Sequence, residues 1–331
     1  MKVFEIRDQW AMENLQPGER PVPEVLPGTV LLRMKAASLN YRDLLVPLRG
    51  YGAQTGELPL IPVSDGVEGV TRVAVGDRVC PIMAQTWISG PPTAERLRGL
   101  LGGPIDGVMA EYMRLGEQGV VKVPAHLSDE QAATLPCAAL TAWSAMVTEG
   151  RIQAGETVLL QGTGGVSLFA LQFAKAQGAR VILLSSSEEK LAKGRQLGAD
   201  EGINYREIPE WGRLAREMAG GEGVDHIVEL GGQQTLGQSL RAIRTGGTIS
   251  LIGVLSGNRM DIPLGPVVTR QIRMQGISVG NRDGFEAMVK GIAQHRIQPV
   301  VDSVFAFDDL HQALDHLKAA RHFGKICLRH E

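Results

Sequence analysis

The chain has 331 residues, of which 44% are hydrophobic and 21% charged, and its net charge is −2. This length exceeds what one hydrophobic core usually serves, so we expect two domains, and the apolar fraction excludes a disordered chain. The net charge is near zero, so the sequence lacks the excess of basic residues that is typical of nucleic-acid-binding proteins. No apolar run is long enough to span a membrane.

The cysteines and the first residues indicate the cellular compartment. Cys80, Cys137 and Cys327 lie far apart and form no CxxC pair, which argues against a disulfide framework and a structural zinc site. The first ten residues carry charges throughout and are unlike a signal peptide. We therefore expect a reduced, cytoplasmic protein.

Short strands broken by proline and glycine are predicted from residue 1 to about residue 124. We expect them to form a small irregular β-barrel. The candidates are Thr29–Ala37, Val73–Val79 (which includes a turn), Met109–Leu115 and Val120–Val123.

From about Ser128 onward, strand and helix patterns alternate, which predicts a parallel sheet with helices on both faces. The predicted strands are Thr157–Gln161, Arg180–Leu184, Gly202–Asn204, His226–Leu230, Thr248–Ile252 and Met274–Val279. The predicted helices are Gly164–Gln177, Ser187–Leu197 with Ser187 as N-cap, Pro209–Met218 and Gln233–Ile243.

The last part of the chain predicts two helices, Phe285–His295 and Asp308–Ala320, followed by a strand, Lys325–Leu328. A chain that returns to strand after the α/β block could rejoin the first domain.

The strongest local motif is the segment Thr157–Ser167, TVLLQGTGGVS, in which a strand runs through Gly162, Gly164 and Gly165 into a helix. Glycine lets the backbone turn tightly against a pyrophosphate, and the helix presents free N–H groups to that anion. Ser167 occupies the third glycine position of the G-x-G-x-x-G pattern, where a small side chain still allows close packing. The motif predicts dinucleotide binding, with an ordinary glycine-rich turn as the alternative.

A second signal follows the second strand of this unit. Enzymes that use NAD normally have an acidic residue there, on the ribose 2′-hydroxyl. This chain has Ser185, Ser186 and Ser187, with Lys190 just after them. Hydroxyls with a cation favour a 2′-phosphate and hence NADPH, and the alternative is a helix N-cap followed by a solvated face.

Together, motifs spread from residue 37 to residue 326 resemble the medium-chain dehydrogenase/reductase superfamily, in its zinc-independent branch similar to quinone oxidoreductases. The matching segments are Ala37–Leu45 (ASLNYRDLL), Pro62–Gly66 (PVSDG), Val75–Val79 (VGDRV), Leu135–Trp143 (LPCAALTAW), Gly162–Ser167, Leu251–Val254 (LIGV) and His322–Ile326 (HFGKI).

This resemblance implies an α/β protein with two domains and a cleft between them. A GroES-like β-barrel catalytic domain would span residues 1–124, completed by 267–331, and a doubly wound Rossmann cofactor domain would span residues 125–266. Relatives have a further strand between the SDG element and the VGDRV turn, and here Val67–Arg72 leaves little room for it.

The resemblance also bears on zinc. Zinc-using relatives hold the catalytic metal with Cys, His and Cys, and the matching positions here are Asn40, Ser64 and Cys137. One thiolate is too few for a site that needs three protein ligands, so we expect no metal. Cys137 is interpreted as a small buried residue, with a reactive thiol as the alternative. His311, Asp315 and His316 lie at helical spacing and could suggest a metal, but a solvated helix face is favoured.

Further site residues are implied by the same match. Asn40 and Tyr41 are expected to face the nicotinamide and to act in catalysis; the alternative for Tyr41 is that it only packs against the cofactor while water supplies the proton. Asp43 is favoured as a structural hydrogen-bond partner, with a catalytic base as the alternative. The expected cofactor-binding residues are Asn40, Thr141, Gly162, Thr163, Gly164, Gly165, Val166, Ser185, Ser186, Lys190, Tyr205, Leu230, Gly231, Ile252, Gly253, Val254 and Lys325.

These observations favour an oxidoreductase that transfers hydride from NADPH to a quinone or an α,β-unsaturated carbonyl without zinc. The alternatives are an NAD(P)-dependent alcohol dehydrogenase and a non-catalytic NADPH-binding protein. Expected partners are NADP and a small-molecule substrate, with no nucleic acid and no membrane, and relatives commonly form homodimers.

Overall fold

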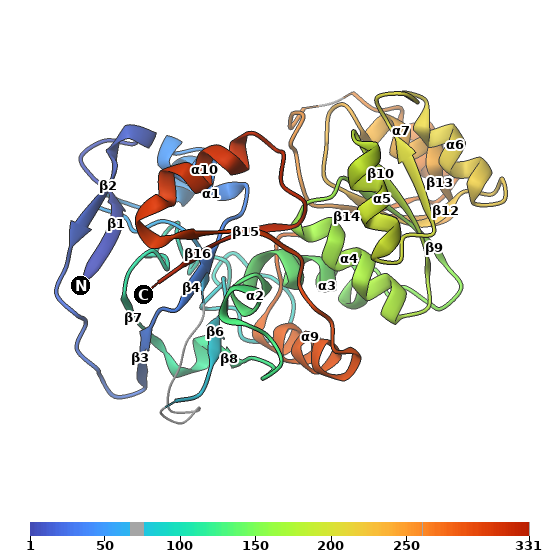
Figure 1. Ribbon diagram of the computed structural model, residues 1–331. Coiled ribbons are helices and arrows are strands. Elements are labelled where there is room, and N and C mark those ends of the chain that lie inside the picture. The colour runs from blue at the N-terminus through green and yellow to red at the C-terminus, as the bar shows by residue number, and fades with distance from the viewer. Residues whose placement is uncertain (67–75, 260, 331) are drawn as a thin grey trace. The chain divides into compact units, whose positions relative to one another are not determined.

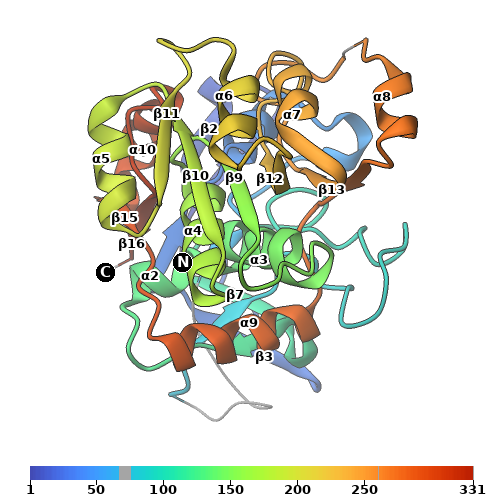
Figure 2. The ribbon, with the colours of Figure 1, turned by 90° about the vertical axis from the view of Figure 1, so that its right-hand side faces the viewer.

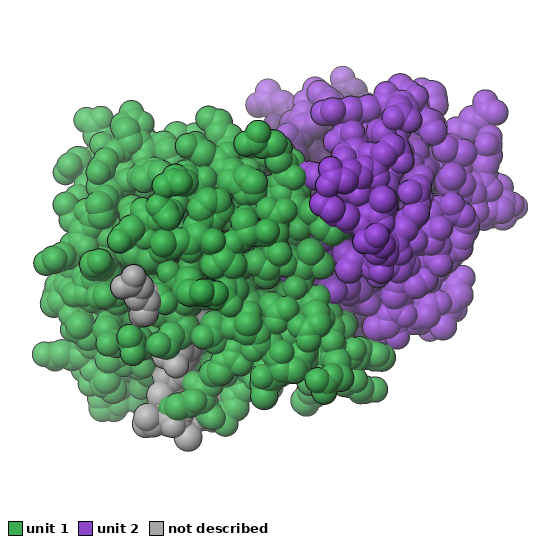
Figure 3. All heavy atoms as spheres, in the orientation of Figure 1, with its two compact units in different colours: residues 1–140, 279–331 green, residues 141–278 purple. Residues whose placement is uncertain are grey.

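The chain divides into two units, each with its own core. The structure is a computed structural model that describes residues 1–66, 76–259 and 261–330. Unit 1 comprises Met1–Leu140 and Val279–Glu331, and unit 2 comprises Thr141–Ser278 (Figure 3). Among the described residues, no helix is both long and apolar enough to cross a membrane.

Unit 1 is built from short antiparallel strand pairs and one four-stranded sheet (Figure 1). The pairs are β1 (Lys2–Ile6) with β2 (Leu15–Glu19), β3 (Thr29–Arg33) with β7 (Tyr112–Gly116), and β6 (Val79–Pro81) with β8 (Val120–Lys122). The sheet has the order β15 (Val301–Ala306), β16 (Lys325–Arg329), β4 (Ala36–Ser38), β5 (Asp65–Gly66). Because β16 pairs antiparallel with β4, the last strand of the chain does rejoin the first domain.

The helical segments of unit 1 are short, apart from α9 and α10. They are α1 (Arg42–Leu45), α2 (Asp129–Ala133), α9 (Arg282–His295), α10 (Leu310–Lys318), a π-helical turn at Leu135–Ala139, and 3₁₀ turns at Met12–Asn14, Val46–Leu48, Gly52–Thr55, Glu117–Gly119 and Phe307–Asp309.

Unit 2 contains a six-stranded parallel sheet in the order β11-β10-β9-β12-β13-β14. Figure 2 shows β11 to β13 side by side in that order. Its strands are β9 (Thr157–Gln161), β10 (Arg180–Ser185), β11 (Glu201–Asn204), β12 (Val224–Glu229), β13 (Ile243–Leu251) and β14 (Arg273–Gly276). Numbered within the unit, this is the strand order 3-2-1-4-5-6 of dinucleotide-binding folds.

The helices of unit 2 cover both faces of this sheet. They are α4 (Gly165–Ala176), α5 (Glu188–Gln196), α6 (Trp211–Met218), α7 (Leu236–Ala242) and α8 (Leu264–Thr269), with α3 (Leu140–Trp143) and a π-helical turn (Ser144–Thr148) before β9. Leu159 and Leu160 point to opposite faces of the sheet, and both are fully buried. Trp211 of α6 packs in the same cluster as Leu159. On the other face, Gly194 of α5 lies so close to Leu183 that a Cβ there would be 2.3 Å from the leucine side chain.

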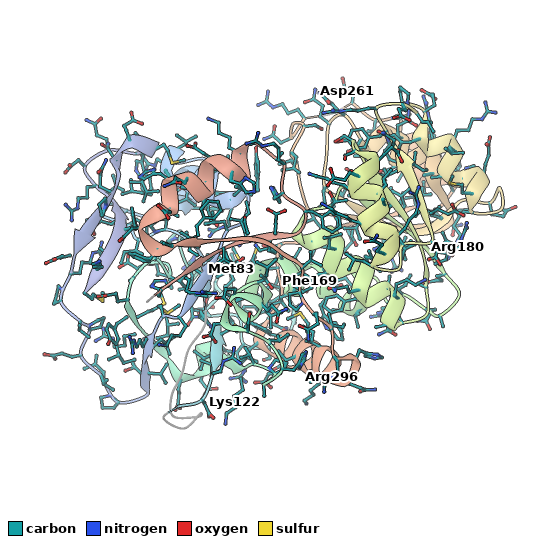
Figure 4. The ribbon with its side chains drawn as sticks, viewed as in Figure 1. Met83, Lys122, Phe169, Arg180, Asp261 and Arg296 are labelled. Carbon is teal, nitrogen blue, oxygen red and sulfur yellow. The ribbon has the colours of Figure 1, made fainter. Side chains whose placement is uncertain are left out.

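Aromatic side chains of α4 contribute to the core of unit 2. Phe169, labelled in Figure 4, stacks on Phe173 with ring centroids 6.1 Å apart. Phe173 in turn meets the edge of Trp143 at 5.3 Å. Both phenylalanines, four residues apart, therefore lie on the same buried face of α4.

Several predicted elements differ at their ends. The strand expected at Thr29–Ala37 is broken, because the chain leaves one sheet at Met34 and enters another at Ala36. Met109–Leu115 begins as strand only at Tyr112, and β13 begins at Ile243, before the expected Thr248. The missing-strand hypothesis concerns Val67–Arg72, which lies outside the described residues, as does part of Val73–Val79.

The ends of the units also lie later in the chain than the expected domain boundaries at residues 124 and 267. Helix α2 explains the first difference, because it packs against β4, β5 and the C-terminal strands β15 and β16. Strand β14 explains the second, because it pairs with β13 in the parallel sheet and so belongs to unit 2.

Candidate active site

The glycine turn of unit 2 faces open space. Strand β9 ends at Gln161, Gly162 has φ +75°, and α4 begins at Gly165 after Gly164 as N-cap. A Cβ added at Gly162 or Gly164 would meet no atom within 4 Å. With no side chain available at the N-cap, the first N–H groups of α4 are left to an anion, as a pyrophosphate site requires.

Ser167, the residue in the third glycine position, has a structural role here. It is fully buried, and its hydroxyl donates to the backbone oxygen of Gln161 at 2.6 Å. This bond ties the first turn of α4 to the end of β9, so the serine fits without loosening the helix–strand contact.

Ser185, Ser186 and Tyr205 lie at the carboxyl ends of two neighbouring strands, and Lys190 lies in the first turn of the helix α5 that follows the serines. Ser185 is the last residue of β10, and its backbone oxygen accepts from the N–H of Tyr205, just past β11, at 3.0 Å. The predicted N-cap is confirmed, since the Ser187 hydroxyl accepts from the backbone N–H of Lys190 at 3.3 Å. This cap uses neither Ser186 nor the Lys190 ammonium, so capping and phosphate binding are compatible interpretations.

The loops after β12 and β13 are bonded to each other. The backbone N–H of Ser256 donates to Gly231 O at 2.8 Å, and that of Leu255 donates to Leu230 O at 3.3 Å. Gly253 is required by this contact, because a Cβ there would lie 2.3 Å from Leu230 O. The expected cofactor residues Leu230, Gly231, Ile252, Gly253 and Val254 therefore lie together, at the same sheet edge as the glycine turn.

Thr141, another expected cofactor-binding residue, is buried. It is 2% exposed, and its hydroxyl donates to Ser278 O in a long bond of 3.4 Å. Thr163 is likewise buried, whereas Val166 is half-buried at the start of α4.

In unit 1, Asn40 lies at the centre of a buried polar network. Its Nδ2 donates to Asp65 Oδ2 at 2.8 Å, and its backbone N–H donates to Asp43 Oδ2 at 2.7 Å. The Lys325 ammonium donates to Asn40 Oδ1 at 2.6 Å and also to Leu39 O. Lys325 is only 4% exposed, so its charge belongs to this network. Tyr41, the next residue after Asn40, is 50% exposed.

The two carboxyl groups of this network are hard to ionise. Burial raises the pKa of Asp43 to about 6, and Asp43 Oδ1 has no hydrogen-bond partner among the described residues. Burial also raises the pKa of Asp65, opposed mainly by the Lys325 ammonium and the Asn40 amide. Asp43 caps the backbone of Asn40, as its expected structural role requires.

Comparison with known proteins identifies the family. The family model described as "Alcohol dehydrogenase GroES-like domain" matches residues 26–125, and the one described as "Zinc-binding dehydrogenase" matches residues 165–294. A zinc-type alcohol dehydrogenase-like protein of Schizosaccharomyces pombe is 40% identical, over 96% of this chain and 95% of its own. The chain belongs to the medium-chain dehydrogenase/reductase superfamily.

Other members support the same assignment. The acryloyl-coenzyme A reductase of Metallosphaera sedula is 29% identical, over 92% of this chain and 93% of its own. The crystal structure of an NAD-dependent alcohol dehydrogenase superposes with a TM-score of 0.90 and 31% identity, covering all of both chains. The expected fold, a GroES-like domain with a Rossmann-type domain, is confirmed, and the chain is an NAD(P)H-dependent oxidoreductase of this superfamily.

The superfamily implies a catalytic zinc, but the matching positions do not fit one. Asn40 gives its amide oxygen to the Lys325 ammonium, and the Ser64 hydroxyl donates to Asp65 at 3.1 Å. Cys137 lies partly buried in the π-helical turn, and burial raises the pKa of its thiol to about 12, so it is protonated near neutral pH. A zinc site needs a thiolate and unprotonated donors, and this set offers a thiol beside a cation.

The helix α10 histidines also have other partners. His311 Nε2 bonds to Leu15 O at 2.8 Å, and His316 Nε2 bonds to Asp302 Oδ2 at 3.0 Å. Among the described residues, no group of three or more His, Cys, Asp or Glu side chains could hold a metal ion.

The sequence interpretation missed Asp65, Gln161 and Glu229. Asp65 follows the serine at a zinc-ligand position, and Gln161 and Glu229 end apolar strands of the parallel sheet. Polar side chains at the carboxyl ends of such strands were the available signal, because that edge is where open α/β sheets bind ligands.

We predict that Lys325→Met destabilises the protein by about 3–5 kcal/mol near neutral pH, because it removes the ammonium that most strongly favours the ionised form of the buried Asp65 carboxyl. Loss of the ammonium raises the carboxyl pKa values further. A carboxyl whose pKa is higher in the folded than in the unfolded protein makes the fold less stable as the pH rises from the unfolded pKa to the folded pKa. The stability defect of the variant therefore grows from about pH 5 to about pH 8. Urea unfolding at both pH values measures it. The double variant Lys325→Met/Asp65→Asn should recover stability at the higher pH, and an equal defect at both pH values would contradict the argument.

Proposed function

We propose that this protein transfers hydride from NADPH to a carbon–carbon double bond conjugated with a carbonyl, or to a quinone, without zinc. The observation that carries this proposal is that Asn40, at one of the three positions where zinc-using relatives bind metal, is instead bonded to Asp65 and to the Lys325 ammonium. NADPH, when bound, supplies the hydride.

The substrate class follows from the donors available. An alcohol or a simple carbonyl needs a Lewis acid to polarise its oxygen, whereas an acceptor activated by conjugation needs less help. Hydride addition at the β-carbon moves an electron pair onto the carbonyl oxygen, and a proton then completes the saturated carbonyl. That one relative is named an acryloyl-coenzyme A reductase supports a conjugated acceptor here.

Asn40 is suited to stabilise the oxygen that gains charge. An amide nitrogen carries two N–H groups, and the one that bonds Asp65 fixes the side chain. The Lys325 ammonium on Oδ1 withdraws electron density from the amide and strengthens the remaining N–H as a donor. The half-exposed Tyr41 hydroxyl supplies a second donor and a proton source.

Hydride acceptors from each class test the proposal. NADPH oxidation should proceed with enals, enoyl thioesters or quinones, whereas alcohols with NADP⁺ should give little turnover. Metal analysis should find well below one zinc per chain, and a chelator should leave the activity unchanged. Alcohol oxidation that requires stoichiometric zinc, and is lost when the zinc is removed, would instead support an alcohol dehydrogenase. Cofactor binding without turnover of any acceptor class would support a non-catalytic NADPH-binding protein.

We also propose that NADPH is preferred over NADH, because Ser185 stands where an acid would repel a 2′-phosphate. Lys190→Ala should weaken NADPH binding roughly 10- to 100-fold by removing one charge-assisted contact, and should barely change NADH binding. Fluorescence titration measures both affinities. Lys193→Ala is the matched control, because this lysine lies on the same helix and pairs with Glu189 at 2.7 Å. Equal losses for the two cofactors would refute a phosphate contact.

For Tyr41→Phe we predict a fall in kcat of about 10- to 1000-fold with unchanged NADPH affinity, since a preorganised donor contributes up to about 4 kcal/mol. Steady-state kinetics with the best conjugated acceptor measures it. Tyr112→Phe, on strand β7, removes a phenol from a strand that carries none of the site residues and should be silent. An unchanged kcat in Tyr41→Phe would assign the proton to water.

A further inference from the structure

We infer that Glu229 and Gln161 are positioning residues that hold the loop Leu230–Gly232 in the shape that the cofactor needs. The inference rests on the proposed use of NADPH, and extends it to two residues that the sequence motifs did not single out. Both are buried at the last positions of adjacent parallel strands, β12 and β9.

One oxygen of the Glu229 carboxylate organises the loop itself. Glu229 is fully buried, and its Oε1 accepts from the backbone N–H groups of Gly231 and Gly232, each at 3.0 Å. The Thr235 hydroxyl, at the start of α7, donates to the same oxygen. The loop therefore wraps around a carboxylate that precedes it in the chain.

The other oxygen of Glu229 joins this loop to strand β9. Oε2 accepts from Gln161 Nε2 at 2.7 Å and from the Ser239 hydroxyl of α7. All five donors to the carboxylate are neutral groups. A buried carboxylate is costly to desolvate, and several hydrogen bonds to its charged form offset that cost.

The side-chain oxygen of Gln161 bonds to the same loop. Its Oε1 accepts from the backbone N–H groups of Leu230 and Gly231, at 3.0 and 3.1 Å. The next residue is Gly162 of the glycine turn. One side chain thus connects the turn expected to bind the pyrophosphate with the loop after β12.

The carbonyl groups of the loop are held from the opposite side. Leu230 O and Gly231 O accept from the backbone of Leu255 and Ser256, and the Ser256 hydroxyl adds a bond to Gly231 O at 2.8 Å. With both its N–H and C=O groups bonded, the loop is fixed before any ligand binds. Such preorganisation lowers the ordering cost of binding, so the predicted effect falls on cofactor affinity.

The pattern of donors and acceptors allows only certain residues. Glu229 must accept at both oxygens, whereas Gln161 must accept at one atom and donate at the other. In Glu229→Gln, either orientation of the new amide points N–H groups at other N–H groups. In Gln161→Glu, two buried carboxylates face each other. In the exchange Gln161→Glu/Glu229→Gln, every acceptor again meets a donor, with the charge moved to the other strand.

The exchange variant is the decisive experiment. We expect each single substitution to weaken NADPH binding roughly ten-fold or more, since a buried unpaired group is costly, and the double substitution to restore it to within about three-fold of the original protein. Fluorescence titration gives the affinities. Hydrogen exchange should show faster exchange at Leu230–Gly232 in Glu229→Gln and slower exchange again in the double variant.

A structural control separates positioning from general destabilisation. Ser250→Ala removes the buried bond between His226 Nε2 and Ser250 Oγ, 3.0 Å long, in the same sheet. It should lower thermal stability but leave NADPH affinity and loop exchange unchanged. Folded single variants that bind NADPH normally, or a folded double variant no better than the weaker single one, would overturn the inference. If the original protein binds neither dinucleotide, the proposed function itself fails, and this role with it.

Discussion

The structure depends on one constraint of parallel sheets, namely that all their strands end at the same edge. In unit 2, the order β11-β10-β9-β12-β13-β14 brings the carboxyl ends of β10, β9, β12 and β13 together, although the chain visits them in a different order. The direction of the chain reverses across the sheet between β9 and β12, and the crevice at such a reversal is where open sheets bind ligands. The glycine turn, the serine cluster and the two cross-bonded loops all follow from that single placement.

Burial of charge sets the second constraint, and the two units meet it differently. In unit 1, the buried carboxyls of Asp43 and Asp65 share their surroundings with the ammonium of Lys325, and their pKa values are nevertheless raised. In unit 2, Glu229 is surrounded by neutral donors. The stabilisation of a buried carboxyl by a cation depends on the protonation of both groups and hence on pH. The stabilisation by neutral backbone, amide and hydroxyl donors depends on how well those donors are aligned.

What could be predicted from the sequence was local. The Gly162 turn and the Ser187 cap each depend on residues that are adjacent in the sequence, and the alternation of apolar segments predicted the parallel sheet. The break of Thr29–Ala37 at Met34 was not predictable, because it depends on which distant strand each half pairs with. The same holds for the site: Gln161 and Glu229 are 68 residues apart, and Asn40 and Lys325 are 285 apart. The sequence did not show that the residues of either pair would be bonded to each other, because only the fold brings them together.

The resemblance identified Asn40 and Lys325 separately, one as facing the nicotinamide and one as contacting the cofactor. The structure joins them by a hydrogen bond of 2.6 Å and so changes what each can do. A zinc ion polarises a substrate oxygen by direct coordination, which needs an open position on the metal. A buried ammonium cannot be approached in that way, and it acts only through a group that it touches. Asn40 is that group, because an amide transmits the pull at its oxygen to its N–H hydrogens. If this amide serves in place of a metal, as we propose, it favours substrates whose own conjugation spreads the developing charge, since an amide donor is weaker than a Lewis acid.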